Sequence, residues 1–196
     1  MFRWFAFAVV VGCFGISGFY RRRARRAGGV IRRREEGALL AGARALVALP
    51  LFAGVAAYLV RPASMAWAAV PLPPWARWLG VALGALTIPA AHWVFRTLGK
   101  NVSETVLTRP GHELVTSGPY RWVRHPLYTT GVTLFLAVGL LAANGFILAF
   151  TALTLVLVRG LVIPREEREL VRRFGDAYRG YAGRTGVLLP RGLWRR

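Results

Sequence analysis

The longest uncharged run in the chain restricts its fold more than any other feature. It extends from residue 126 to residue 158 and holds no Asp, Glu, Lys or Arg. At about 1.5 Å per residue, a single helix of that length would be longer than the ~30 Å hydrocarbon core of a bilayer. Residues 142–145, with the sequence AANG, offer a break because Asn and Gly accept left-handed conformations. The run therefore predicts two short helices in a tight hairpin, at about 126–141 and 146–163.

Three further apolar blocks precede this run, at about residues 4–20, 38–60 and 76–98. Hydrophobic residues make up 55% of the 196-residue chain. They fall in blocks rather than at the periods of 2 or 3.6 that mark strands and helices of soluble proteins. The expected fold class is an all-α integral membrane protein with about five transmembrane helices. Three spans lie in residues 1–97, and the hairpin lies in residues 98–196.

The arginines set the expected orientation. The net charge is +19, from 27 Lys and Arg against 8 Asp and Glu, and Lys100 is the single lysine. Basic residues between apolar blocks mark the cytoplasmic side, so we expect the N-terminus outside and the C-terminus inside. The basic segment 21–34 is interpreted as a solvated loop that sets this topology, with lipid binding as the alternative. A nucleic-acid partner is disfavoured, because the aromatic residues lie in or beside the spans rather than among the arginines.

Other titratable residues are few. Cys13 is the single cysteine, which excludes an intrachain disulfide and a cysteine-based zinc cluster, and no metal site is expected. His92 and Arg96 are four residues apart and share one face of the third span. They are interpreted either as snorkelling or interhelical contacts or as part of a binding site.

The two ends of the predicted hairpin bring opposite charges together, because a hairpin returns to the side it left. The residues expected to meet there are Arg124, His125, Tyr128, Glu166 and Glu167. Alone, each group has a structural explanation: basic residues are common beside a span, and glutamate in a first helical turn complements the helix dipole. Together they predict a site for a ligand that carries both signs of charge.

The segments that flank this site are a loop and a helix. Residues 99–124 are polar, irregular and rich in Gly and Pro, and a loop of this length in a compact protein is normally functional or disordered. After the acidic pair, an apolar stripe recurs at spacings of four, four and three, formed by Leu170, Phe174, Tyr178 and Tyr181. This stripe predicts one helix that packs on the membrane surface or on the hairpin and caps the site.

These motifs resemble the isoprenylcysteine carboxyl methyltransferase family, to which phospholipid methyltransferases are related. The resemblance rests on HELVTSGPYRWVRHPLY, the apolar hairpin after it, the pair EE and FGDAYRGY, and it covers about residues 98–190. One position departs from the family pattern. Where the family has a small residue two positions after the tyrosine of Arg-His-Pro-x-Tyr, this chain has Thr130, and Gly131 follows it.

The resemblance implies an integral membrane enzyme that uses S-adenosylmethionine, with residues 98–196 as its methyltransferase core and its active site cytoplasmic. It implies a cofactor pocket built from the loop, the hairpin ends and the C-terminal helix. Its implied cofactor-binding residues are His112, Leu114, Val115, Tyr120, His125, Pro126, Tyr128, Glu166 and Glu167. The candidates for catalytic roles are Arg124, which would position an anionic acceptor, and Glu167.

The expected reaction is methyl transfer to a lipophilic acceptor, most like isoprenylcysteine carboxyl methylation. Phospholipid, small-thiol and quinone-like acceptors are the alternatives. A carboxylate or thiolate acceptor needs no general base, whereas an amine does, and a glutamate or His125 would then serve. The expected partners are thus a lipophilic or prenylated acceptor and membrane lipids. A different class of function is a non-catalytic membrane protein of the same fold, which would not bind the cofactor.

Overall fold

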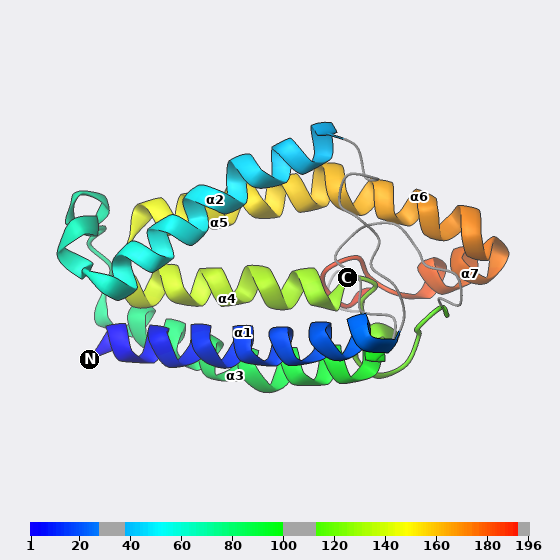
Figure 1. Ribbon diagram of the computed structural model, residues 1–196, viewed down its shortest axis with the longest axis horizontal. Coiled ribbons are helices and arrows are strands. Elements are labelled where there is room, and N and C mark those ends of the chain that lie inside the picture. The colour runs from blue at the N-terminus through cyan, green and yellow to red at the C-terminus, as the bar shows by residue number, and fades with distance from the viewer. Residues whose placement is uncertain (28–37, 100–112, 192–196) are drawn as a thin grey trace.

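The computed structural model describes residues 1–27, 38–99 and 113–191 and is built from helices (Figure 1). The α-helices are α1 (Phe2–Ala27), α2 (Ala38–Val60), α3 (Pro74–Leu98), α4 (Pro126–Ala142), α5 (Gly145–Leu157), α6 (Ile163–Phe174) and α7 (Asp176–Arg184). Short 3-10 turns, η2 (Pro62–Ala68) and η4 (Gly118–Arg121), precede α3 and α4, and a π-helical turn, η5 (Val158–Val162), joins α5 to α6.

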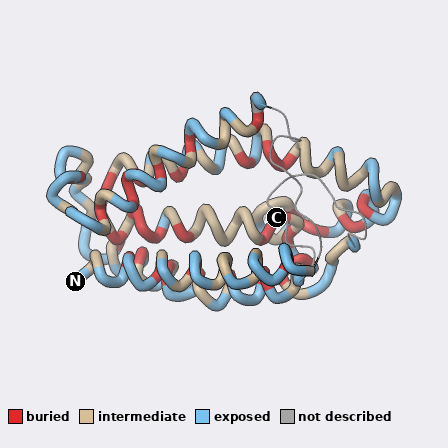
Figure 2. Tube along the Cα trace, in the orientation of Figure 1, coloured by how far each residue is buried: buried red, intermediate tan, exposed pale blue. Residues whose placement is uncertain are grey.

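The first five helices form one bundle. α3 packs on α1 and α4, and α5 packs on α4 and α2. The buried core between them is apolar, with Val9, Leu51, Val138 and Ile147 among its members. Large apolar side chains also face outward along α1, α2 and α3, as the exposed outer faces in Figure 2 illustrate. Outward apolar faces on long helices are typical of proteins whose solvent is lipid, so the chain is an integral membrane protein.

Among the residues that the structure describes, four helical segments are long and apolar enough to cross a bilayer. They are Phe2–Arg26, Leu40–Val60, Pro74–Leu98 and Gly145–Phe174. The remaining apolar helix, α4, has 17 residues and falls below that length. The structure therefore confirms an all-α membrane protein, with four candidate spans among the described residues. The fifth span and the transmembrane hairpin stay predictions.

The first helix is longer than the sequence predicted. α1 continues through the arginines to Ala27, so the part of the basic segment that the structure describes, residues 21–27, is helical rather than a loop. Arginine is a good helix former, and neither Gly nor Pro occurs between Gly18 and Gly28 to end the helix. The rest of that segment lies outside the described residues.

The break in the long uncharged run lies where the sequence predicted it. Ala143 has a left-handed conformation with φ 49°, and Asn144 caps α5 by accepting a hydrogen bond from the Ile147 amide at 3.0 Å. The second half of the run differs from the prediction, because α5, η5 and α6 form one continuous helical path. Pro164 lacks an amide hydrogen, and the wide π-turn before it lets the chain pass the proline without ending the helix.

The expected single C-terminal helix is two helices. Gly175, with φ 53°, ends α6, and α7 begins at the next residue. Glycine accepts this left-handed conformation without strain, which explains the break. Tyr178 and Tyr181 remain buried, on α7.

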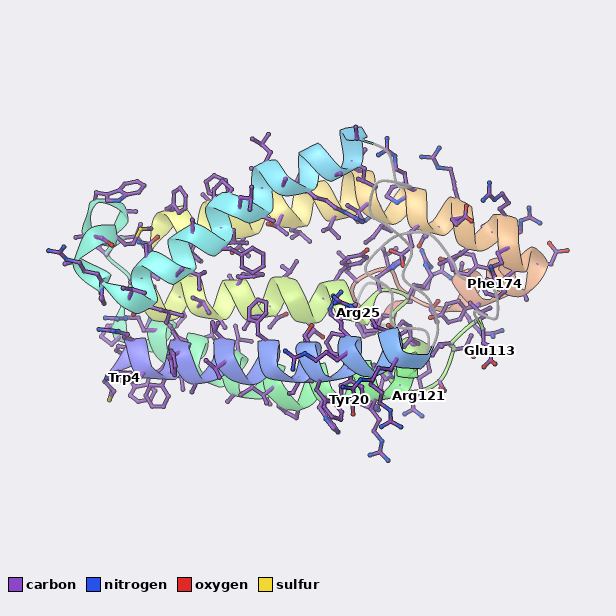
Figure 3. All side chains as sticks on the ribbon, in the orientation of Figure 1. Trp4, Tyr20, Arg25, Glu113, Arg121 and Phe174 are labelled. Atoms are coloured by element: carbon purple, nitrogen blue, oxygen red, sulfur yellow. The ribbon has the colours of Figure 1, made fainter. Side chains whose placement is uncertain are left out.

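One end of the bundle is polar. The C-terminal ends of α1 and α3, the start of α4, and α6 and α7 all gather there, opposite the N-terminus and η2 (Figure 1). The side chains of Arg25, Glu113 and Arg121 lie at this end in Figure 3, whereas Trp4 lies at the other. The start of α4 and the first turns of α6, which carry most of the site residues predicted from the sequence, belong to this polar end.

Candidate active site

The start of α4 and the first turns of α6 meet through a shared carboxylate. Glu167 Oε1 lies 2.8 Å from Arg124 Nε and 3.2 Å from His125 Nε2. Charge-assisted hydrogen bonds of this kind are stronger than neutral ones. The predicted meeting of the basic and acidic groups is therefore present, across more than forty residues of sequence.

Glu166 makes a second connection between the same two elements. Its Oε2 accepts a hydrogen bond from the Tyr128 hydroxyl at 2.9 Å and lies 3.8 Å from His125 Nδ1. His125 is 4% exposed, and its two ring nitrogens face two different carboxylates. The imidazole is thus held between Glu166 and Glu167 at a fixed orientation.

Arg124 also holds the C-terminal part of the chain. Its Nη1 donates to the carbonyl oxygens of Ala182 at 2.7 Å and Thr185 at 2.8 Å, at the end of α7. Since its Nε is bound to Glu167, this one side chain joins α4, α6 and α7. The geometry gives Arg124 a positioning role at the centre of the cluster.

The chain after α7 pairs with the segment before α4. The amide of Arg124 donates to the Gly186 carbonyl at 2.8 Å, and the amide of His125 donates to the Val187 carbonyl at 3.1 Å. The Thr129 hydroxyl donates to the Leu188 carbonyl at 2.8 Å. Residues 186–188 therefore lie along the start of α4 and hold the backbone that carries His125.

Two buried tyrosines connect η4 to α7. The Tyr181 hydroxyl donates to the Tyr120 carbonyl at 2.7 Å. Burial raises the pKa of Tyr120 well above its usual value, and the nearby charge of Glu166 raises it further. Tyr120 therefore lies close to the acidic pair and stays protonated at neutral pH.

A basic residue of α2 adds to the site and was not predicted. The positive charge of Arg44 acts on the Glu166 carboxyl. α2 packs against α5, which leads into α6, and this packing brings Arg44 near the cluster. No local pattern around Arg44 marks it, because its place depends on how two distant helices pack.

The other predicted residues lie around this cluster. Pro126 is buried at the first position of α4, and Leu114 and Val115 are half-buried in the irregular segment before η4. His112 falls outside the described residues. His92 is exposed and contacts the Tyr20 ring with centroids 5.7 Å apart, which favours the interhelical interpretation over a part in binding.

The family comparison covers the two elements that build this cluster. The model of the isoprenylcysteine carboxyl methyltransferase (ICMT) family matches residues 80–172, from α3 through most of α6. The matched region is just under half of the chain and is similar to the ICMT family. The match includes both Arg124–His125 and Glu166–Glu167, so the cluster lies within the ICMT region.

A solved structure has a similar fold over nearly the whole chain. It is the eukaryotic intramembrane Ras methyltransferase ICMT, with a TM-score of 0.55 and 21% sequence identity, and the alignment covers 95% of this chain and 68% of that one. At this identity the likeness establishes the ICMT fold, including the helices outside residues 80–172.

Sequence relatives match shorter segments. Methanethiol S-methyltransferase 1 of Bradyrhizobium diazoefficiens is 38% identical over 77 residues, which is 39% of this chain and 25% of that protein. The methanethiol S-methyltransferase of Mycobacterium tuberculosis is 38% identical over 71 residues, 36% of this chain and 28% of that one. The nickel-cobalt-cadmium resistance protein NccN of Alcaligenes xylosoxydans xylosoxydans is 32% identical over 115 residues, 58% of this chain and 53% of that one. The aligned segments span a quarter to about half of these relatives.

Proposed function

We propose that this protein is a membrane-embedded methyltransferase that uses S-adenosylmethionine and acts on a lipophilic acceptor. The observation that carries the proposal is the position of Glu167, bound to both Arg124 and His125 with Glu166 beside it. This cluster of two carboxylates, an imidazole and a guanidinium lies within the ICMT-family region, at the polar end of a membrane bundle.

We infer that this polar end faces the cytoplasm and that the N-terminus lies outside. In support, the described arginines of α6 and α7 and of the end of α1 belong to that end, whereas the opposite end carries Arg3, Arg61 and Arg77. Basic residues are enriched on the cytoplasmic side of membrane proteins. A water-soluble cofactor would then enter from the cytosol and a lipophilic acceptor from the bilayer.

The residues of the cluster fit the cofactor. S-adenosylmethionine, when bound, supplies a methyl group on a positively charged sulfur, next to an amino-acid tail. The carboxylates of Glu166 and Glu167 suit the ammonium of that tail. The hydroxyl of Tyr128 and the ring of His125 both lie against Glu166, from the first turn of α4 and the residue before it.

The contacts around Glu167 indicate how the chain prepares the site. Arg124 and His125 hold its carboxylate at a fixed place before any ligand arrives, so little reorganisation is needed on binding. We infer that α7 and residues 186–188 cover this end and exclude water. Arg124 and Glu167 remain our candidates for direct contact with the acceptor or the transferred methyl group.

The acceptor that we propose first is the carboxylate of an isoprenylated cysteine, because the fold of this chain matches that of the eukaryotic ICMT. A small thiol is the second candidate, because two relatives with 38% identity are named methanethiol S-methyltransferases. Both acceptors react as anions, so neither requires a general base. Methyl transfer from labelled S-adenosylmethionine to N-acetyl-S-farnesylcysteine and to an alkanethiol distinguishes them.

Calorimetry with detergent-purified protein tests the proposal. We expect the wild type to bind S-adenosylmethionine and Glu167→Ala and His125→Ala each to weaken binding at least tenfold. Glu169→Ala is the matched control on α6, because Glu169 pairs with the exposed Arg172. His92→Ala is the control for the histidine. A well-folded wild type that does not bind the cofactor would favour a non-catalytic membrane protein of the same fold.

A further inference from the structure

The hydroxyl of Tyr178 is buried without a hydrogen-bond partner among the residues that the structure describes. Tyr178 lies on α7 and is 2% exposed. Its neighbour on the same face, Tyr181, has a ring centroid 6.0 Å away and a hydroxyl that is satisfied by the Tyr120 carbonyl. Because buried hydroxyls nearly always have a partner, the exception calls for an explanation.

The surroundings of this hydroxyl are those of the proposed cofactor site. The charges of Glu167, Arg124 and Glu166 all act on Tyr178. Burial raises the pKa of Tyr178, so the phenol keeps its proton at neutral pH and acts as a donor. The cluster therefore contains one buried O–H group that its own side chains leave unused.

α7 does not need this hydroxyl to hold its place. Its C-terminal half is fixed by Arg124, which binds the Ala182 and Thr185 carbonyls, and by the hydroxyl of Tyr181. The oxygen of Tyr178 is thus a desolvated polar group that no hydrogen bond from residues 1–27, 38–99 or 113–191 compensates. Such a group is typical of a site in which a ligand supplies the missing acceptor.

We propose that the Tyr178 hydroxyl donates a hydrogen bond to the α-carboxylate of S-adenosylmethionine. The inference rests on the proposed function. In the cofactor the ammonium and the carboxylate share one carbon atom, so a carboxylate group lies beside any ammonium held by Glu166 and Glu167. That carboxylate needs a donor rather than a second acidic residue. Arg124 gives its Nε to Glu167 and its Nη1 to two backbone carbonyls, whereas the Tyr178 hydroxyl makes no hydrogen bond among the described residues and is free to donate to the carboxylate.

The test compares two ligands on Tyr178→Phe, which removes only the oxygen. Calorimetry is run with S-adenosylmethionine and with its decarboxylated analogue, on the full chain in detergent. We expect the variant to bind S-adenosylmethionine about tenfold more weakly than wild type, as for one hydrogen bond to a charged group. Affinity for the decarboxylated analogue should not change. The ligand-free variant should melt at the same temperature as wild type or higher, because the lost hydroxyl has no partner in the part of the chain that the structure describes.

Tyr181→Phe is the matched control, because it removes a hydroxyl that has a partner. It should lower the melting temperature of the ligand-free protein and shift the affinities for both ligands equally. If Tyr178→Phe leaves both affinities unchanged, or weakens both equally, the carboxylate assignment is wrong while the proposed function stands. If folded wild type binds no S-adenosylmethionine, the proposed function fails, and this inference fails with it.

Discussion

Arg124 Nε lies 2.8 Å from Glu167 Oε1, although 43 residues separate the two in the sequence. The same guanidinium reaches the end of α7 through the carbonyls of Ala182 and Thr185. One side chain therefore fixes α6 and α7 against the start of α4. The proposed cofactor site depends on this arrangement, because His125 is the next residue and shares Glu167.

Arg124→Ala should lower the free energy of unfolding by about 3 kcal/mol, because one partly buried carboxylate and two carbonyls each lose a donor. The substitution leaves Glu167 without its guanidinium and two carbonyls of α7 without their donor. Thermal unfolding in detergent measures the effect. Arg172→Ala is the control, because Arg172 is 77% exposed and its pair with Glu169 should contribute less than about 1 kcal/mol. Equal losses in the two variants would contradict the positioning role of Arg124.

The α4–α5 turn provides a second prediction, at Asn144. Its side chain caps α5 at Ile147, and its Nδ2 donates to the Met65 carbonyl at 3.1 Å. Asn144→Ala should cost about 3 kcal/mol, because the cap is lost and a buried carbonyl is left unpaired. The neighbouring substitution Ala143→Gly should have the opposite sign, since Ala143 has φ 49°. Relief of that left-handed strain should stabilise the protein by about 1 kcal/mol. Two variants that both destabilise would mean that this turn differs from the one described.

Much of the fold could be predicted because its causes are local. Hydropathy alone located α2 at residues 38–60, and the Asn and Gly of residues 142–145 located the break between α4 and α5. The meeting of the site groups was predictable as well. It follows from the length of the uncharged run and the position of its break. A break near the middle means that the second helix ends at the same end of the bundle where the first one begins.

The errors arose where a local pattern allows two structures. Arginines mark a cytoplasmic segment whether or not they are helical, so α1 could extend to Ala27 without any change in the topology signal. The pair Gly175–Asp176 is a signal that was missed, since Gly ends helices and Asp favours a first turn. Arg44 could not have been found from sequence, because its distance from Glu166 depends on how α2 packs on α5.

The raised pKa of Tyr181 predicts that the folded protein loses stability at high pH. Burial raises the pKa of Tyr181 to about 12, compared with about 10 in the unfolded chain. The folded protein therefore holds this proton more tightly than the unfolded one. The resulting stability is complete below pH 10 and declines as the pH rises toward 12. In Tyr181→Phe the decline in melting temperature between pH 10 and pH 12 should be shallower than in wild type. An identical pH profile would show that Tyr181 is accessible to solvent.

The last prediction concerns the contact between α3 and α4, which positions His125 at the end of the bundle. A Cβ atom added at Gly80 would lie 2.9 Å from the Ala137 carbonyl oxygen and 2.9 Å from the Leu141 amide nitrogen. Both are backbone atoms, so α4 would have to move away from α3.

Gly80→Ala should therefore lower the free energy of unfolding by about 2 kcal/mol, as overpacking of a core typically does. It should also weaken S-adenosylmethionine binding, because a shift of α4 moves His125 relative to Glu167. Gly15→Ala is the control, since an added Cβ on that α1 glycine meets no atom within 4 Å. That control should be neutral or stabilising by up to about 1 kcal/mol, the difference in helix propensity. If both variants melt and bind as wild type does, α3 and α4 do not approach each other as closely as the structure indicates.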